Sequence, residues 1–260
     1  MKRFSHLIVA LLALTAINSA QAWNGIGHAS IAAIAERNLT PEAKQKCRDY
    51  LHHTLPYYAS WMDHWRNCKG FEHTSIWHGI WVDTENNPIK GDPHNAAMHI
   101  ERICKKMRKY HKLKDSIVCD NLKYLIHLVG DMHCPVHIKY NDEPHLRQRS
   151  IRMNGKKVGY HSYWDSAIGH FNKGMKCDAI AAKYDTLTPE QIAALTAGKP
   201  SEWGRVQAME MRRIFDLLPT HCEYNDISEE TKTEIADLTT EQMRRGGYRL
   251  AKILNDIFSK

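Results

Sequence analysis

Apolar residues recur at helical spacing over most of this chain, and helix-start signals precede two of these segments. Thr40-Pro41-Glu42 supplies an N-cap and a proline at the first helical position, so it predicts a helix that runs to about His53. Thr188-Pro189-Glu190 repeats this signal. The apolar spacing predicts further helices over residues 95–110, 120–131, 203–218 and 240–258. The chain is therefore expected to be built mainly from helices.

One segment has a different pattern. Residues 150–160 contain Asn154-Gly155 between two short alternating runs, which predicts a β-hairpin with a type I′ turn. We find no internal repeat, low-complexity tract or long linker. The expected fold is all-α: a single compact multi-helix domain with a small β-hairpin, covering residues 23–260.

The first 22 residues have the pattern of a secretory signal peptide. Lys2 and Arg3 precede an apolar run over residues 7–17, and Ala20-Gln21-Ala22 provides a cleavage site. The apolar run is too short for a membrane span, so a retained anchor is the weaker alternative. Cleavage after Ala22 makes Trp23 the first residue of the mature chain. We expect a secreted or periplasmic protein with no membrane span after processing and no protein partner.

The net charge of the chain does not by itself identify a class of partner. Removing Lys2 and Arg3 lowers the formal net charge from +7 to about +5, which allows a polyanionic partner without requiring one. The densest basic run, residues 105–114, is interpreted as a solvated helix end rather than a phosphate contact.

Export of seven cysteines predicts up to three disulfides and one leftover thiol. No Cys-x-x-Cys pair is present, which argues against a thiolate zinc site.

Histidines and aspartates stand at metal-ligand spacing. His127 and Asp131 are four residues apart, so on a helix they share one face, and His161 and Asp165 repeat this spacing. His137 follows just past the end of the helix predicted over residues 120–131. With Asp63 and His78 upstream, these residues form a nitrogen and oxygen set that suits zinc better than calcium.

The chain resembles the secreted single-strand-specific zinc nucleases and 3′-nucleotidases, the nuclease S-one/P-one type, through an ordered set of motifs. The motifs lie between Trp23 and Asp165, and nothing beyond residue 165 is matched. They are Trp23-x-x-x-Gly27-His28, Trp61-x-Asp63-x-x-Arg66, Trp77-His78, the eleven-residue run His127-x-x-Gly130-Asp131-x-His133-x-Pro135-x-His137, and His161-x-x-Trp164-Asp165.

This resemblance implies a helical protein with three clustered zinc ions. One zinc would be held by Asp63, His78, His127 and Asp131, and a second by His137, His161 and Asp165. A third would be held by His28, Asp131 and the free α-amino group and carbonyl of Trp23, so that Asp131 bridges two ions. Zinc acidifies water near neutral pH, which suits phosphoryl transfer.

The residues expected around the metal ions match the family motifs less completely than the ligands do. Arg66 matches the motif arginine and is expected to clamp a phosphate oxygen, with a salt bridge to a neighbouring carboxylate as the alternative. The family usually has an aromatic residue directly after the second-motif histidine, whereas Gly79 stands there in this chain. Trp81 is the candidate for stacking on a base, with a core role equally open, and Asp83 is a weak candidate for orienting water. His133 is expected to be structural.

The expected function is hydrolysis of single-stranded RNA and DNA to 5′-phosphate products by a three-zinc phosphodiesterase, with 3′-nucleotidase activity. The substrate would be single-stranded nucleic acid or a 3′-nucleotide. The first alternative is a zinc-dependent phospholipase C, which shares the N-terminal Trp but has a longer gap to its first His and closes with His-x-x-x-Glu. A non-catalytic metal reservoir is disfavoured, because it would be expected to carry runs of His rather than single His paired with Asp.

Overall fold

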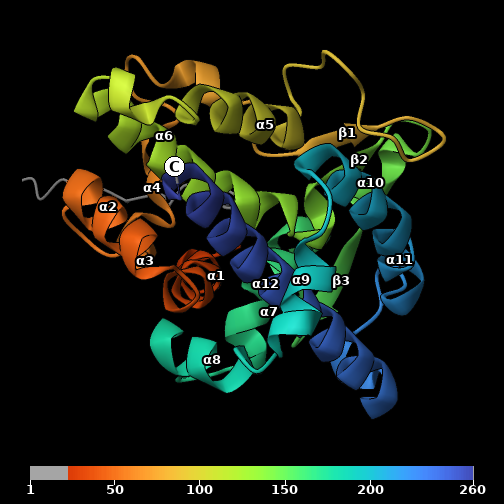
Figure 1. Cartoon of the computed structure of the whole chain (residues 1–260). Coiled ribbons are helices and arrows are strands. Elements are labelled where there is room, and N and C mark those ends of the chain that lie inside the picture. The colour runs from red at the N-terminus through yellow and green to blue at the C-terminus, as the bar shows by residue number, and fades with distance from the viewer. Residues whose placement is uncertain (1–22, 260) are drawn as a thin grey trace, which may run out of the picture.

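The protein is a mostly helical single domain with two small two-stranded sheets (Figure 1). The computed structural model describes residues 23–259, so the predicted signal peptide lies outside the described residues. The strands are β1 (Ile80–Val82), β2 (Ile138–Tyr140), β3 (Ser150–Met153) and β4 (Lys156–Gly159). The helices are α1 (Gly25–Arg37), α2 (Pro41–Leu51), α3 (Leu55–Tyr58), α4 (Trp61–Trp65), α5 (Ala96–Met107), α6 (Asp115–Met132), α7 (Tyr160–Phe171), α8 (Cys177–Tyr184), α9 (Pro189–Thr196), α10 (Pro200–Met211), α11 (Ile214–Leu217) and α12 (Glu229–Phe258).

The 30-residue helix α12 crosses the molecule and packs against α1 (Figure 1). The side chain of Ser228 caps its first turn by accepting a hydrogen bond from the backbone N–H of Thr231. Gly247 allows the two helices to approach closely, because a Cβ there would lie 2.5 Å from Cγ2 of Ile34 and 3.1 Å from the carbonyl oxygen of Ile31. Ile31 and Ile34 are fully buried at this contact.

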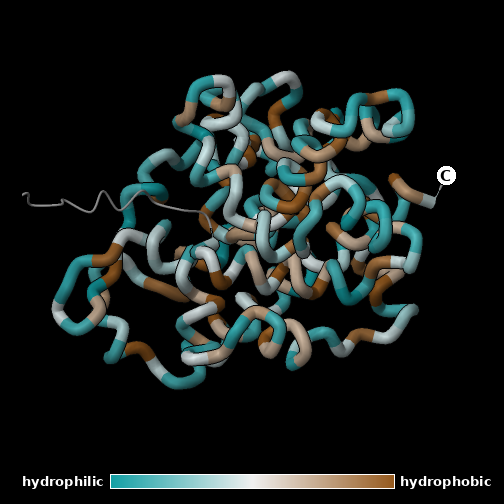
Figure 2. The backbone as a smooth tube through the Cα atoms, turned by 90° about the vertical axis from the view of Figure 1, so that its left-hand side faces the viewer, coloured by the Kyte–Doolittle hydropathy of each residue, from teal (hydrophilic) through white to brown (hydrophobic). Residues whose placement is uncertain are grey.

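Helices α5 and α6 pack against each other on one side of α12, and α7 and α8 lie on the other (Figure 1). Hydrophobic segments concentrate toward the middle of the backbone trace, while hydrophilic segments occupy much of its outer loops (Figure 2). The core includes Leu122, Leu125 and Leu128 of α6, all fully buried. Within the described residues, no helix is long and apolar enough to cross a membrane.

Local capping explains why the helix predictions largely hold. The Thr40 side chain accepts a hydrogen bond from the N–H of Ala43, and α2 ends at His52 with φ of 62°. Thr188 and Gln191 form a capping box at the start of α9. The single helix predicted over residues 203–218 is wrong, because the chain breaks it into α10 and α11 around Arg213.

The two sheets differ in how well the sequence predicted them. Strands β3 and β4 form the expected antiparallel hairpin, and φ values of 52° at Asn154 and 74° at Gly155 fit the type I′ turn. The parallel pair β1–β2, with Ile80 opposite Ile138, was not expected. Strand β1 follows His78 and strand β2 follows His137, so this pairing brings the segments behind two candidate ligands together.

The cysteines differ from the expectation. All seven are free thiols in the structure, so the predicted disulfides are wrong here. Cys47 is buried on α2 and Cys134 is buried beyond the end of α6, whereas Cys68 is exposed. An oxidising compartment permits disulfides, but the fold does not bring these sulfur atoms together.

We predict that Gly247→Ala destabilises the protein, because its new Cβ would overlap Ile34 in a packed helix contact. The free energy of unfolding, measured by urea denaturation, should fall by about 1–3 kcal/mol. Gly159→Ala is the matched control, since a Cβ there meets no atom within 4 Å. Its effect should stay within about 0.5 kcal/mol. Equal losses in the two variants would show that the α1–α12 approach does not require Gly247.

Candidate metal centre

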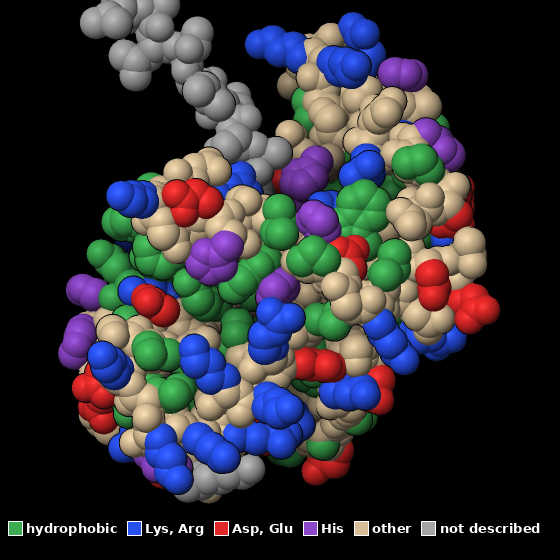
Figure 3. All heavy atoms as spheres, turned by 90° about the horizontal axis from the view of Figure 1, so that it is seen from above, with side chains coloured by type: hydrophobic (Ala, Val, Ile, Leu, Met, Phe, Trp, Pro, Cys, Tyr) green, Lys and Arg blue, Asp and Glu red, His purple; other side chains and the backbone are tan. Residues whose placement is uncertain are grey.

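Eight of the predicted ligand side chains converge from several elements. Helix α6 contributes both His127 and Asp131, one turn apart on the same face. The other six come from α1, α4, the segment before β1, the short 3₁₀ helix Pro135–His137, and α7. They are His28, Asp63, His78, His137, His161 and Asp165. Figure 3 shows several histidine side chains near the middle of one face, in the angle between two lobes.

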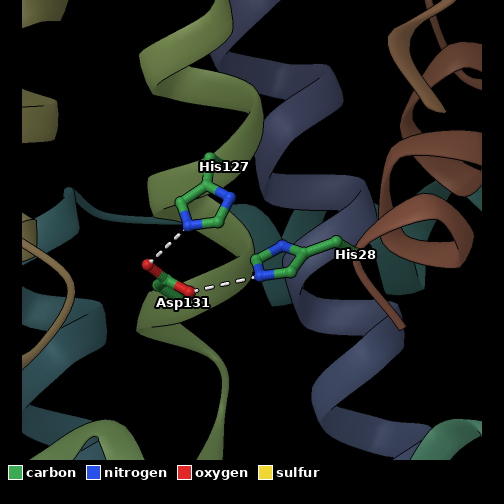
Figure 4. Close-up of side chains that lie close together, drawn as sticks. All are labelled: His28, His127 and Asp131. Atoms are coloured by element: carbon green, nitrogen blue, oxygen red, sulfur yellow. Dashed lines mark ion pairs between the residues drawn. The ribbon is translucent and has the colours of Figure 1, made fainter. Parts of the chain in front are cut away.

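Asp131 lies at the centre of the set and is fully buried. Its Oδ2 lies 2.7 Å from Nδ1 of His78 and 3.1 Å from Nε2 of His127. Its Oδ1 lies 3.3 Å from Nε2 of His28 and 3.7 Å from Nδ1 of His137. Figure 4 shows His28 reaching from α1 toward one carboxylate oxygen while His127 faces the other. Asp131 therefore contacts four histidines at once and is placed to bridge two cations.

Asp63 completes the first group. Its Oδ1 lies 3.7 Å from Nε2 of His127 and 3.9 Å from Nδ1 of His78, and these two nitrogens are 3.1 Å apart. Asp63, His78 and His127 offer ligand atoms within 4.8 Å of one another, and His28, His127 and Asp131 do the same. Both groups are buried.

The second predicted site contains a residue that sequence reasoning missed. Cys134, His137 and Asp165 form a third buried group with ligand atoms within 4.8 Å. Sγ of Cys134 lies 3.4 Å from Oδ1 of Asp165, and Nε2 of His161 lies 3.2 Å from Oδ2 of the same carboxylate. The signal that could have identified Cys134 is its position between His133 and His137, inside the densest motif.

Trp23 is anchored beside these groups. Its side chain is fully buried, and its indole N–H donates a hydrogen bond to the carbonyl oxygen of Gly130, 3.0 Å away. The backbone N–H of Asn24 donates to the carbonyl oxygen of Asp165 at 2.6 Å. The backbone of Trp23 also lies within hydrogen-bonding reach of the Cys134 thiol. The predicted first residue of the mature chain thus lies against both candidate sites.

The surroundings hold the ligand rings in fixed orientations. Nδ1 of His127 lies 2.8 Å from the carbonyl oxygen of Ala59, which places the proton on Nδ1 and turns Nε2 toward the cluster. Gly130 admits the ring of His28, because a Cβ at that position would lie 2.7 Å from Nδ1 of His28. The rings of His28 and His127 stack with centroids 4.2 Å apart.

The electrostatics of the centre attract positive charge. Burial opposes ionisation of Asp131, but His127, His137 and His78 outweigh it and hold the pKa of this carboxyl well below its usual range. Burial also lowers the pKa of His137 and of His28. Although burial opposes protonation of His127 as well, Asp131 and Asp63 raise its pKa to about 9. The cluster therefore favours a cation at Nε2 of His127.

Unsatisfied polar atoms test whether metal ions fit. Within the described residues, several buried ligand atoms have no hydrogen-bond partner, although such atoms are costly to leave unpaired. They are both ring nitrogens of His28 and of His137, both oxygens of Asp63, Nε2 of His78, Oδ1 of Asp131 and Oδ2 of Asp165. Metal ions would satisfy one nitrogen of each of these rings together with the carboxylate oxygens, so the three groups can hold metal ions.

Arg66 lies at the edge of the first group. Its Nη1 is 3.3 Å from Oδ1 of Asp63, and 18% of its side chain is exposed. The salt bridge that was the alternative is thus present, but its partner is itself a candidate ligand.

Trp81 lies on β1, and Asp83 lies in the loop that follows this strand. Oδ1 of Asp83 accepts hydrogen bonds from the backbone N–H groups of Glu85 and Asn87, both at 2.9 Å, which favours a turn-forming role. These bonds, with that from Asn87 first, lower the pKa of Asp83. Trp81 is half-buried, and the guanidinium carbon of Arg147 lies 4.8 Å from its ring centroid.

His133 is not part of any of the three groups, in keeping with the structural role expected for it. Its Nδ1 lies 2.7 Å from the carbonyl oxygen of Val129, and its Nε2 lies 2.8 Å from Nη1 of Arg249 on α12. His133 therefore ties the end of α6 to the long helix α12.

Comparison with known proteins agrees with this geometry. Residues 23–259 match the family model described as S1/P1 Nuclease. Nuclease S1 from Aspergillus oryzae is 22% identical over 100% of this chain and 99% of its own length. Nuclease P1 from Penicillium citrinum is 23% identical, over 90% of this chain and 97% of its own, and Endonuclease 4 from Arabidopsis thaliana is 24% identical, over 94% and 91%. The chain belongs to the S1/P1 nuclease family.

Proposed function

We propose that this protein is an exported zinc phosphodiesterase that hydrolyses single-stranded RNA and DNA to 5′-phosphate products and acts as a 3′-nucleotidase. The observation that carries this proposal is the convergence of four histidines on the buried carboxylate of Asp131. Buried ligand groups of this kind, in a chain of this family, support hydrolysis of a phosphoric ester. Residues 1–22 are proposed to be its signal peptide, which leads to a secreted or periplasmic protein.

Three zinc ions are proposed. The first would be held by Asp63, His78, His127 and Asp131, and the second by His137, His161 and Asp165. The third would be held by His28, Asp131 and the α-amino group and carbonyl of Trp23. Imidazole nitrogens with carboxylate oxygens are typical zinc ligands, whereas calcium prefers oxygen alone.

The side chains around the metals are proposed to bind and orient the substrate. Bound zinc would supply Lewis acidity toward a phosphoryl oxygen and toward water. Arg66, held 3.3 Å from Asp63, would donate hydrogen bonds to a phosphate oxygen and balance charge in the transition state. Trp81 is proposed to contact the substrate from the edge of the β1–β2 sheet. Asp83 is left out of this set, because its carboxylate is engaged by the turn that follows β1.

The preference for single strands follows from access. An unpaired strand can turn a phosphate and its base toward a recessed site that a rigid duplex cannot enter. His78 and His137 are each at most 8% exposed, so the phosphate must reach inward to the ligands.

The decisive experiment combines metal content with activity on paired substrates. Protein processed to begin at Trp23 should contain three zinc ions by elemental analysis and cleave single-stranded oligonucleotides faster than duplexes. It should release phosphate from 3′-AMP, and a chelator should abolish both activities. Activity that survives chelation would exclude the metal mechanism, and phosphocholine release from lecithin without nuclease activity would favour the phospholipase alternative.

The free amino group of Trp23 gives a second prediction. One extra alanine before Trp23 moves the α-amino group away from His28 and Asp131, so the protein should bind one zinc ion fewer and lose most of its turnover. Elemental analysis and initial rates, compared with the correctly processed protein, check this. Unchanged zinc content and turnover would show that the amino group is not a ligand.

Arg66 gives a third prediction. Arg66→Ala should lower kcat by about 10²-fold, in line with removal of one charge-stabilising donor, while zinc content changes little. Arg108→Ala, at an exposed position at the end of α5, is the control and should leave both unchanged. If zinc content falls in parallel with kcat, Arg66 acts by holding Asp63 and not by binding the phosphate.

A further inference from the structure

A pair of basic side chains lies beside the candidate metal centre on the β1–β2 sheet. Lys139 of β2 is the register partner of Trp81 on β1. Gly79, which directly follows His78, leaves room for the Lys139 side chain. A Cβ on Gly79 would lie 2.9 Å from Cε of Lys139 and 3.1 Å from its Nζ. The lysine therefore packs over Gly79, directly beside the candidate ligand His78.

Arg147 reaches the same place from the segment Pro144–Gln148. Its guanidinium carbon is 4.8 Å from the ring centroid of Trp81, and Nζ of Lys139 is 5.5 Å from that centroid. The indole ring thus positions two cations by cation–π contact. Lys139 and Arg147 also line one pocket with His161, a candidate zinc ligand, so the two cations border the metal centre.

The charges at this edge are not balanced. Within residues 23–259, the ion pairs include neither Lys139 nor Arg147; Lys139 is repelled by Arg147 and attracted more weakly by Asp131 and Asp92. The acidic residues of the same loop are paired with one guanidinium: Asp142 lies 2.9 Å from Nη2 of Arg212, and Glu143, which lines the same pocket as Lys139 and Arg147, pairs with Nη1 of Arg212. Two unpaired cations held together in a partly buried pocket favour binding of an anion.

We propose that Lys139 and Arg147 bind a second phosphate of the substrate. This phosphate is the next one along the nucleic acid chain from the phosphate at the metal centre. This inference rests on the proposed function and deepens it. The ligand class is a phosphodiester anion within an oligonucleotide, so the enzyme should favour oligonucleotides over 3′-mononucleotides, which have no second phosphate. Trp81 then serves this subsite by holding the cations in place.

The test distinguishes binding of the second phosphate from binding of the phosphate at the metal centre. Lys139→Gln and Arg147→Gln should each raise KM for a single-stranded tetranucleotide about tenfold, since each removes one charge-assisted contact. KM for 3′-AMP should change less than about twofold, because that substrate does not reach the subsite. Lys173→Gln, at an exposed position after α7, is the matched control and should behave as the unmodified protein. Zinc content should be equal in all four proteins.

Binding provides a readout that does not need hydrolysis. The affinity of the zinc-loaded protein for a fluorescent phosphorothioate tetranucleotide is measured against salt concentration. Each of the two variants should reduce the slope of log affinity against log salt by about 1. An unchanged slope, or an equal rise in KM for 3′-AMP and for the tetranucleotide, overturns the proposal. A reduced slope in a protein that cleaves neither substrate would uphold the phosphate subsite and reject the hydrolytic function.

Discussion

The buried carboxylate of Asp131 is the constraint on which the rest of the site depends. A charge with no exposure to water is stable only if opposite charge surrounds it, because its desolvation costs several kcal/mol. Four histidines contact its two oxygens, and they come from α1, α6, the segment before β1 and the turn after α6. Because His127 is on the same helix as Asp131, the fold must bring three further segments to this side chain, with nitrogen–oxygen distances of 2.7 to 3.7 Å.

Helix α1 meets this requirement through two close approaches to neighbouring helices. Gly247 of α12 admits Ile34, and Gly130 of α6 admits the ring of His28. A Cβ at either glycine would overlap a side chain of α1, so α1 or its neighbouring helix would have to shift. Packing and ligand geometry are thus linked along a single helix. A substitution at Gly247, remote from every ligand in sequence, acts on the same helix that presents His28 to the metal centre.

Local signals explain how much the sequence could predict. The pairs His127–Asp131 and His161–Asp165 were readable because helix geometry alone places such residues on one face. The parallel β1–β2 pair was not, because strands of three residues carry no periodic signal and their pairing joins distant segments. Cys134 was missed because its role depends on Asp165, on another helix. The disulfide prediction was wrong for the same reason: compartment and cysteine number do not fix which sulfur atoms meet.

The β1–β2 pair also explains a departure from the family motif that the sequence left open. The family resemblance leads to the expectation of an aromatic residue at position 79, so Gly79 on sequence alone puts a base-stacking surface in doubt. In the structure that space holds the stem of Lys139, with the oxygen of His137 only 3.1 Å from a Cβ placed on Gly79. Positions 79 and 139 are therefore coupled: an aromatic side chain at 79 requires that Lys139 be shortened or moved. At this position the chain therefore presents a cationic side chain, and a cation is suited to holding the phosphate of a nucleotide chain rather than its base.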